Sequence, residues 1–236
     1  MQNSLLFRLL AVTGLYIGLK YYGGEVGEKI LYPITLLVTF LHELGHGLGT
    51  IITGGKVLHI DIESNGAGVT LSQGGWRGVI LMGGYIGSAV LGNILFYIGA
   101  RRAKWAPVTV NILCAMMVFT GIYWHGSMFA TGFLIAFAIA LSLISKFTKL
   151  DREILMFLGL ASILYIIQDF NVGPSSDLKA YAEHMVIFPK VVWMYLWLGI
   201  ALLLCFFNLR LIFSSSPTNK KYPSNNKEEV LDDLKY

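Results

Sequence analysis

Two histidines and a glutamate stand close together in the sequence HELGH, residues 42–46. On a helix, His42 and His46 project from one face about one turn apart, so their imidazoles can hold a single metal ion. Glu43 is then placed to act on water rather than to bind the metal. A chance match is the alternative, but the motif lies in an apolar run over about residues 30–52. Ionisable groups in such a run are rare unless they serve a function, so the motif predicts a metal site.

The overall composition is that of an integral membrane protein. Of the 236 residues, 55% are hydrophobic and only 14% are charged, and the mean hydropathy is +0.64. These values lie well outside the range of soluble globular proteins. The net charge of +4 does not indicate a nucleic-acid partner, because the basic residues gather at the ends of apolar segments. Cys114 and Cys205 both fall inside apolar segments, which argues against a disulfide framework.

The hydropathy pattern predicts an all-α polytopic membrane protein with about seven transmembrane helices. The predicted helices cover about residues 4–21, 30–52, 78–100, 106–124, 128–147, 154–167 and 191–213. Pro33 falls in the first turn of the second predicted helix, where its missing N–H does no harm. The helices make up one membrane-embedded domain over residues 1–213. Polar and charged residues then replace the apolar pattern, which predicts a disordered cytoplasmic tail over residues 214–236.

Between the second and third predicted helices, the pattern changes to that of a small β-hairpin. Residues 57–63 alternate apolar and polar side chains, a turn-rich segment covers residues 64–68, and residues 69–71 form a second short run. The hairpin either caps a pair of helices or offers an edge strand to an extended substrate. The sequence leaves both roles open.

Lysines and arginines are distributed unevenly between the two sides of the predicted helices. The connections after the first, third and fifth helices and the tail are rich in them, whereas the opposite loops carry Lys56, Arg77, Lys179 and Lys190. The positive-inside rule makes the rich side cytoplasmic and places the N-terminus outside. The HELGH end of its helix then lies toward the non-cytoplasmic face.

A third metal ligand is expected on the same side, because zinc hydrolases usually use three protein ligands and leave one position open. Asp177, in a loop-like segment, and Asp169, at the end of the sixth predicted helix, are the best candidates. His125 and His184 are less favoured candidates for the third ligand. Asp177 can alternatively be the first residue of a helix over residues 178–185, stabilised there by the helix dipole.

Together these residues resemble the site-2 protease group of intramembrane zinc metalloproteases, especially its compact prokaryotic-type branch. The resemblance covers roughly residues 30–200, and its most specific part is HELGH followed by Gly54-Gly55 and a hairpin. The segment NVGPSSD, residues 171–177, is similar to the segment that leads to the family's aspartate. Its spacing is shorter, however, and Leu178 replaces a glycine. The glycine-rich segment before Asn93 resembles the family's third-helix segment, whose asparagine is thought to help hold substrate.

The resemblance implies that His42, His46 and an aspartate bind Zn²⁺, with Asp177 as the first choice and Asp169 as the alternative. It implies that Glu43 is the catalytic base of an HExxH-type metalloendopeptidase and that Asn93 binds substrate. Residues 1–213 would be a metalloprotease-like domain for regulated intramembrane proteolysis of membrane-protein substrates. The implied location is the bacterial cytoplasmic (inner) membrane, with the lipid bilayer but no nucleic acid as partner. The alternatives are a metal-binding membrane protein without peptidase activity and a transporter-like protein.

Overall fold

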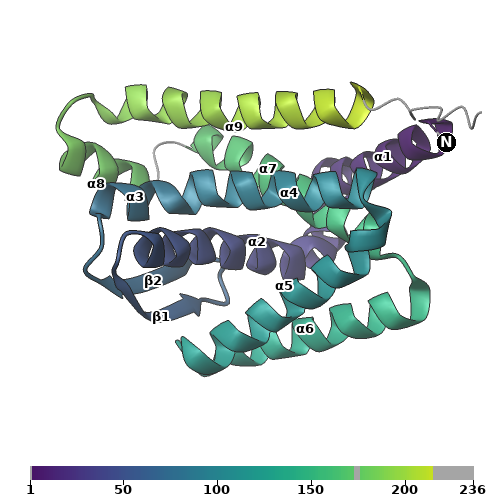
Figure 1. Ribbon diagram of the computed structural model, residues 1–236, viewed down its shortest axis with the longest axis horizontal. Coiled ribbons are helices and arrows are strands. Elements are labelled where there is room, and N and C mark those ends of the chain that lie inside the picture. The colour runs from purple at the N-terminus through teal and green to yellow at the C-terminus, as the bar shows by residue number, and fades with distance from the viewer. Residues whose placement is uncertain (1, 173–175, 215–236) are drawn as a thin grey trace, which may run out of the picture.

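The computed structural model describes residues 2–172 and 176–214, and shows long helices gathered along one axis with a small sheet at one end (Figure 1). The predicted tail from residue 215 onward lies outside the described residues. The α-helices are α1 (Gln2–Ile17), α2 (Gly24–Ile52), α3 (Arg77–Met82), α4 (Ser88–Arg101), α5 (Ala106–Tyr123), α6 (Met128–Thr148), α7 (Asp151–Val172), α8 (Ser176–Met185) and α9 (Lys190–Ser214). Short π- or 3-10 segments are η1 (Gly18–Tyr22), η2 (Gly83–Gly87) and η3 (Ala103–Trp105), and the strands are β1 (Lys56–Ile62) and β2 (Gly68–Gln73).

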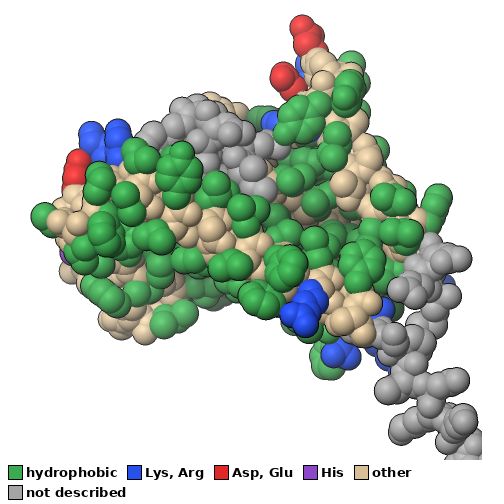
Figure 2. Space-filling view, turned by 90° about the horizontal axis from the view of Figure 1, so that it is seen from above, with side chains coloured by type: hydrophobic (Ala, Val, Ile, Leu, Met, Phe, Trp, Pro, Cys, Tyr) green, Lys and Arg blue, Asp and Glu red, His purple; other side chains and the backbone are tan. Residues whose placement is uncertain are grey.

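The prediction of a helical membrane protein with a hairpin between its second and third long helices is confirmed. Within the described residues, six helical segments are long and apolar enough to cross a membrane. They correspond to six of the seven predicted spans. The remaining predicted span, residues 154–167, lies within α7. Apolar side chains cover the face of the molecule seen from above, as expected for contact with lipid (Figure 2).

Helix α2 is the centre of the fold, and every residue from Leu36 to Gly47 is buried. Its apolar side chains form a core with α4, α5, α6 and α7. The predicted start of this helix near Ile30 is wrong, because α2 begins at Gly24 and Pro33 therefore lies in its interior. The charged residues before Ile30 lower the hydropathy, but they are good helix formers and extend the helix.

The backbone of α2 touches the backbone of η2 at the level of the HELGH motif. A Cβ atom added to Gly83 would lie 2.5 Å from the carbonyl oxygen of Gly45, and one added to Gly87 would lie 3.0 Å from the Cα of Gly45. Any side chain at these positions would force the two segments apart. The glycines therefore permit the close approach that the membrane interior favours between helices.

Strands β1 and β2 pair antiparallel, with Ile62 opposite Gly68 and Ile60 opposite Thr70. The outer edge of β1 is covered by the connection between α5 and α6, because the Ile60 N–H donates to the Trp124 carbonyl at 2.9 Å. Asp61 fastens the same edge, since its Oδ1 accepts hydrogen bonds from the Ser127 hydroxyl at 2.6 Å and the Ser127 N–H at 3.1 Å. Partial burial raises the pKa of Asp61, but these hydrogen bonds outweigh it and lower that pKa.

The outer edge of β2 has a different environment from that of β1. Among the described residues, β2 has no second strand beside it. Its burial alternates, with Gly68 and Thr70 half-buried and Val69 and Leu71 exposed. The β1 edge of the hairpin is therefore hydrogen-bonded to the α5–α6 connection, whereas the β2 edge has no strand beside it among the described residues.

The start of α1 lies at the same end of the molecule as the basic α4–α5 connection and the end of α9 (Figure 1). Arg8 forms an ion pair with Glu153 at the start of α7, and Leu5 packs in one cluster with Ala100 and Ile212. The prediction of an N-terminus on the opposite side is therefore wrong. Counting alternate crossings failed because α1 runs along α7 in the same direction: Arg8 meets Glu153, and Tyr16, later in α1, meets Phe157, later in α7.

Candidate metal centre

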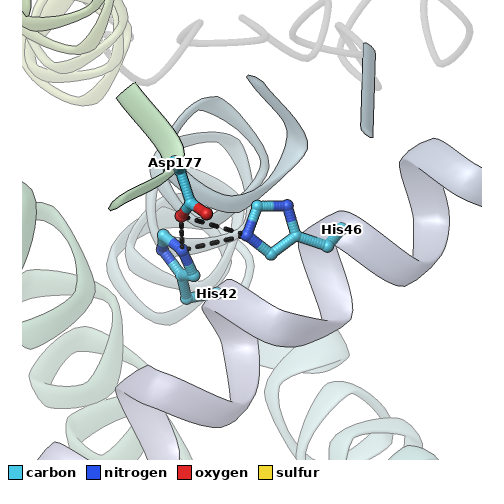
Figure 3. Close-up of side chains that lie close together, drawn as sticks. All are labelled: His42, His46 and Asp177. Carbon is cyan, nitrogen blue, oxygen red and sulfur yellow. Dashed lines mark hydrogen bonds and ion pairs between the residues drawn. The ribbon is translucent and has the colours of Figure 1, made fainter. Parts of the chain in front are cut away.

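Three side chains from two distant helices converge on one point (Figure 3). The Nε2 atoms of His42 and His46 lie 3.2 Å apart. The Oδ2 atom of Asp177 lies 3.0 Å from Nε2 of His42 and 3.2 Å from Nε2 of His46. The histidines come from α2 and the aspartate from α8.

Helix α8 carries Asp177 in its first turn, where a carboxylate also interacts favourably with the helix dipole. The helix is held by aromatic and apolar packing, because Leu178 is fully buried and Tyr181 is nearly so. The Tyr181 ring meets the Trp193 and Trp197 rings of α9 edge-on, with centroids 4.8 and 4.9 Å apart. This packing sets the position of the third side chain relative to α2.

The distances among the three atoms fit a small metal ion. Zinc bonds to histidine nitrogen and carboxylate oxygen are about 2.0–2.1 Å long in tetrahedral sites, so two ligand atoms lie about 3.3 Å apart. The observed separations of 3.0–3.2 Å come close to this value. The donor set of two imidazoles and one carboxylate also matches the preference of zinc for nitrogen and oxygen ligands.

The surroundings of His46 select the form of the ring that a metal needs. Its Nδ1 lies 2.6 Å from the carbonyl oxygen of Ile80, which can only accept a hydrogen bond. The proton of a neutral ring must therefore sit on Nδ1, leaving the lone pair of Nε2 directed at His42 and Asp177. Asp177 is suited to ligation as well. Burial alone raises the pKa of Asp177, but the nearby rings of His42 and His46 outweigh it and hold that pKa well below its usual range, so the carboxylate is ionised.

Glu43 lies beside the three ligands but is not one of them. Its side chain is buried, and its Oε2 accepts a hydrogen bond of 2.8 Å from the hydroxyl of Thr70 on β2. A cavity of about 380 Å³ reaches this carboxylate. The walls come from α2, the hairpin, α3, η2, α7 and α8, and the lining residues are Thr39, His42, Glu43, His46, Gly66, Ala67, Gly68, Val69, Thr70, Ile80, Leu81, Tyr85, Tyr165 and Asp177.

Gly84 forms the wall on the η2 side of the three ligands. A Cβ atom at this position would lie 2.5 Å from Nε2 of His42 and 2.5 Å from Nε2 of His46. We therefore expect Gly84→Ala to weaken zinc binding roughly tenfold to a hundredfold, the range seen when the shell around a metal site is disturbed. Zinc titration of the purified protein measures this. Gly132→Ala is the control, since nothing lies within 4 Å of a Cβ there, and equal zinc affinity of both variants would contradict the expectation.

The other candidates from the sequence lie elsewhere or are not described. Asp169 belongs to α7, but its side chain is outside the described part of the structure. His125 bonds to Thr131 through Nδ1 at 2.7 Å, and His184 is exposed on α8. Neither belongs to the cluster of His42, His46 and Asp177. Asn93 is buried on α4 and faces α9, where Asn208 donates to its side-chain oxygen at 2.8 Å. Its role in substrate binding stays a prediction.

Sequence reasoning did not identify Thr70, Ile80 or Tyr85 as parts of this site. The alternation of the hairpin offered a signal for Thr70, because it is the polar residue between Val69 and Leu71. Ile80 acts through its main-chain carbonyl, which leaves no trace in the type of side chain. The Tyr85 ring meets the His42 ring edge-on at a centroid distance of 4.7 Å, and only packing reveals this.

Comparison with known proteins gives one family. A model of the family described as Peptidase M50B-like matches residues 9–208, which is well over half of the chain. The match includes both histidines, Glu43 and Asp177. No curated protein and no solved structure matches the chain significantly.

Proposed function

The chain belongs to the Peptidase M50B-like family, and from this premise we propose that it is a zinc metalloendopeptidase acting on membrane-spanning substrates. The family supports a membrane metalloprotease of the site-2 protease type. The observation that carries the proposal is the convergence of His42, His46 and Asp177 beside the buried carboxylate of Glu43. The role proposed for the protein is regulated intramembrane proteolysis.

The proposed chemistry divides the work between four side chains. His42 and His46 as neutral imidazoles and Asp177 as a carboxylate would hold Zn²⁺, which lowers the pKa of water and polarises a carbonyl group when bound. Glu43 takes a proton from the water whose oxygen attacks the carbonyl carbon of the scissile bond. It then passes that proton to the amide nitrogen as the carbon–nitrogen bond breaks.

We expect the cavity to receive an extended peptide rather than an intact helix. Peptide bonds inside a membrane helix are shielded by their own hydrogen bonds, so the substrate must unwind locally before cleavage. The free edge of β2 supports this step, because an unwound segment can pair with an exposed strand through main-chain hydrogen bonds. The resemblance to the site-2 protease group supports a location in the bacterial cytoplasmic membrane, with lipid and membrane-protein substrates as partners.

Metal removal tests the proposal. We expect the full-length protein in lipid vesicles to contain one zinc ion per chain and to cleave at least one of a panel of single-span membrane proteins. A chelator should abolish cleavage, and added Zn²⁺ should restore it, because the water must be activated at the three-ligand site. Zinc content is measured by emission spectroscopy and cleavage by the appearance of product fragments.

Three results would overturn the proposal. The first is a wild-type preparation that lacks stoichiometric zinc and whose metal content does not fall in the His46→Ala variant. The cluster would then have no role in metal binding. Zinc-loaded protein that cleaves nothing in the panel would leave a metal-binding membrane protein without peptidase activity. Cleavage that persists unchanged in chelator would exclude a metal-dependent mechanism.

A further inference from the structure

Strand β2 lies in direct contact with the side chain of Glu43. The Thr70 hydroxyl lies 2.8 Å from Oε2 of Glu43 and 2.9 Å from the main-chain carbonyl oxygen of the same residue. Gly68, two residues earlier, is pressed against the same side chain, because a Cβ atom there would fall 2.7 Å from Cγ and from Oε1 of Glu43. The carboxylate is thus enclosed by one face of the strand.

The hairpin is fixed in this position from both sides. On the α2 side, the Thr39 hydroxyl donates to the Gly66 carbonyl at 2.9 Å, and the Tyr32 hydroxyl donates to the Ser64 carbonyl at 2.7 Å. On the other side, the hydrogen bonds between Asp61 and Ser127 fasten β1 to the α5–α6 connection. The hydroxyl of Thr70 is therefore held at a defined place beside Glu43.

We propose that Thr70 is a positioning residue for Glu43, whose hydroxyl holds the carboxylate in the orientation from which it accepts a proton. The proposal rests on the function proposed above. A glutamate side chain has several rotatable bonds, and a general base works only within hydrogen-bond reach of the proton that it removes. A hydrogen bond from a fixed hydroxyl removes most of that freedom before substrate arrives.

The register of the hairpin gives Thr70 a second contact. Thr70 is opposite Ile60, and the Ile60 N–H points away from β2, toward the Trp124 carbonyl. Opposite residues in an antiparallel pair direct their main-chain groups alike, so those of Thr70 point toward the free edge of β2. An extended substrate on that edge would meet the main chain of Thr70 while its side chain holds Glu43. One residue would thus align the peptide with the base.

Replacing the hydroxyl by a methyl group tests the proposal. In full-length protein in lipid vesicles, we expect Thr70→Val to lower kcat roughly tenfold to a hundredfold, the effect of losing a hydrogen bond to a charged group. KM and zinc content should stay as in the wild type, because the main chain of β2 and the three ligands are unchanged. Thr70→Ser, which keeps the hydroxyl, should recover most of kcat.

Two further variants sharpen the test. Ser72→Ala removes a hydroxyl from the same half-buried face of β2, outside the residues that line the cavity, and should leave kcat and KM unchanged. Thr70→Ala lacks the hydroxyl and is smaller than valine, so it should lose as much kcat as Thr70→Val if packing is not the cause.

The contrary outcomes are distinct. A wild-type kcat in Thr70→Val, or an equal loss in Thr70→Ser, would refute positioning by the hydroxyl while leaving the protease intact. A loss of zinc in Thr70→Val would assign the residue to metal binding instead. An inactive wild-type protein would overturn the proposed function itself, and the positioning role with it.

Discussion

Replacing Glu43 with glutamine is expected to lower the cleavage rate of membrane substrates roughly a hundredfold to ten-thousandfold, the contribution of a positioned general base. An amide has the shape of the carboxylate and can still meet the Thr70 hydroxyl, but it cannot accept the proton from water. Zinc content should be unchanged, because Glu43 lies beside His42, His46 and Asp177 without joining the cluster. Single-turnover cleavage in lipid vesicles and zinc analysis of the same preparation measure the two quantities.

The same substitution at a second glutamate is the control, because it removes a negative charge without removing the proposed general base. Glu63 lies exposed at the start of the hairpin turn, where its Oε2 accepts a hydrogen bond of 2.9 Å from Asn65. Glu63→Gln should therefore keep both zinc and cleavage. Unchanged cleavage in Glu43→Gln would remove the peptidase assignment, whereas loss of zinc from that variant would make Glu43 a ligand.

Asp177→Asn should lose zinc, and its cleavage activity should fall with the metal. The substitution keeps the size of the side chain, but a neutral amide is a far weaker ligand than the carboxylate that now lies 3.0 Å from His42 and 3.2 Å from His46. We expect zinc affinity to fall by more than the roughly tenfold to hundredfold that loss of an outer partner costs. Competition with a fluorescent zinc chelator gives the affinity directly.

Asp169→Asn is the comparison that decides the third ligand. Both aspartates were candidates from the sequence, and the structure brings Asp177 to the histidines. Asp169→Asn should therefore lose less zinc than Asp177→Asn. The reverse order of zinc affinities would reassign the third position to Asp169.

The two histidines could be predicted from the sequence because their geometry is local. Residues four apart on a helix share a face whatever surrounds the helix, so the 3.2 Å between the Nε2 atoms of His42 and His46 needed only α2. For the third ligand, the sequence offered the candidates Asp177 and Asp169 but could not determine which of them lies beside the histidines. Its position depends on how α8 packs against α9 through Tyr181, and no local pattern encodes that contact.

For the hairpin too, the features that depend on neighbouring residues could be predicted, and the contacts with distant residues could not. Alternation predicted its two strands and which residues share a face. It could not show that the Thr70 face would meet Glu43, because this depends on how the hairpin folds back along α2. From the sequence, Gly84 could likewise be interpreted only as a glycine that lets helices pack closely. Its position against the rings of His42 and His46 depends on tertiary structure and could not be predicted.

The N-terminus was misplaced for an electrostatic reason. The positive-inside rule was applied to seven segments assumed to cross in alternation. Arg8 interrupts the first of them, and its ion pair with Glu153 brings α1 beside the start of α7. Such pairing between distant charges is invisible to a count of loop residues. The basic α4–α5 and α6–α7 connections still lie at one end of the helices, opposite the hairpin (Figure 1).

The separation of the ligands along the chain gives the metal a further consequence. Asp177 lies 135 positions from His42 and 131 from His46, so a bound ion would cross-link two remote parts of one polypeptide. Ligation that occurs only in the folded state adds its free energy to folding. A bound ion would then stabilise the folded chain as well as serve its chemistry, and removing the ion would lower the free energy of unfolding.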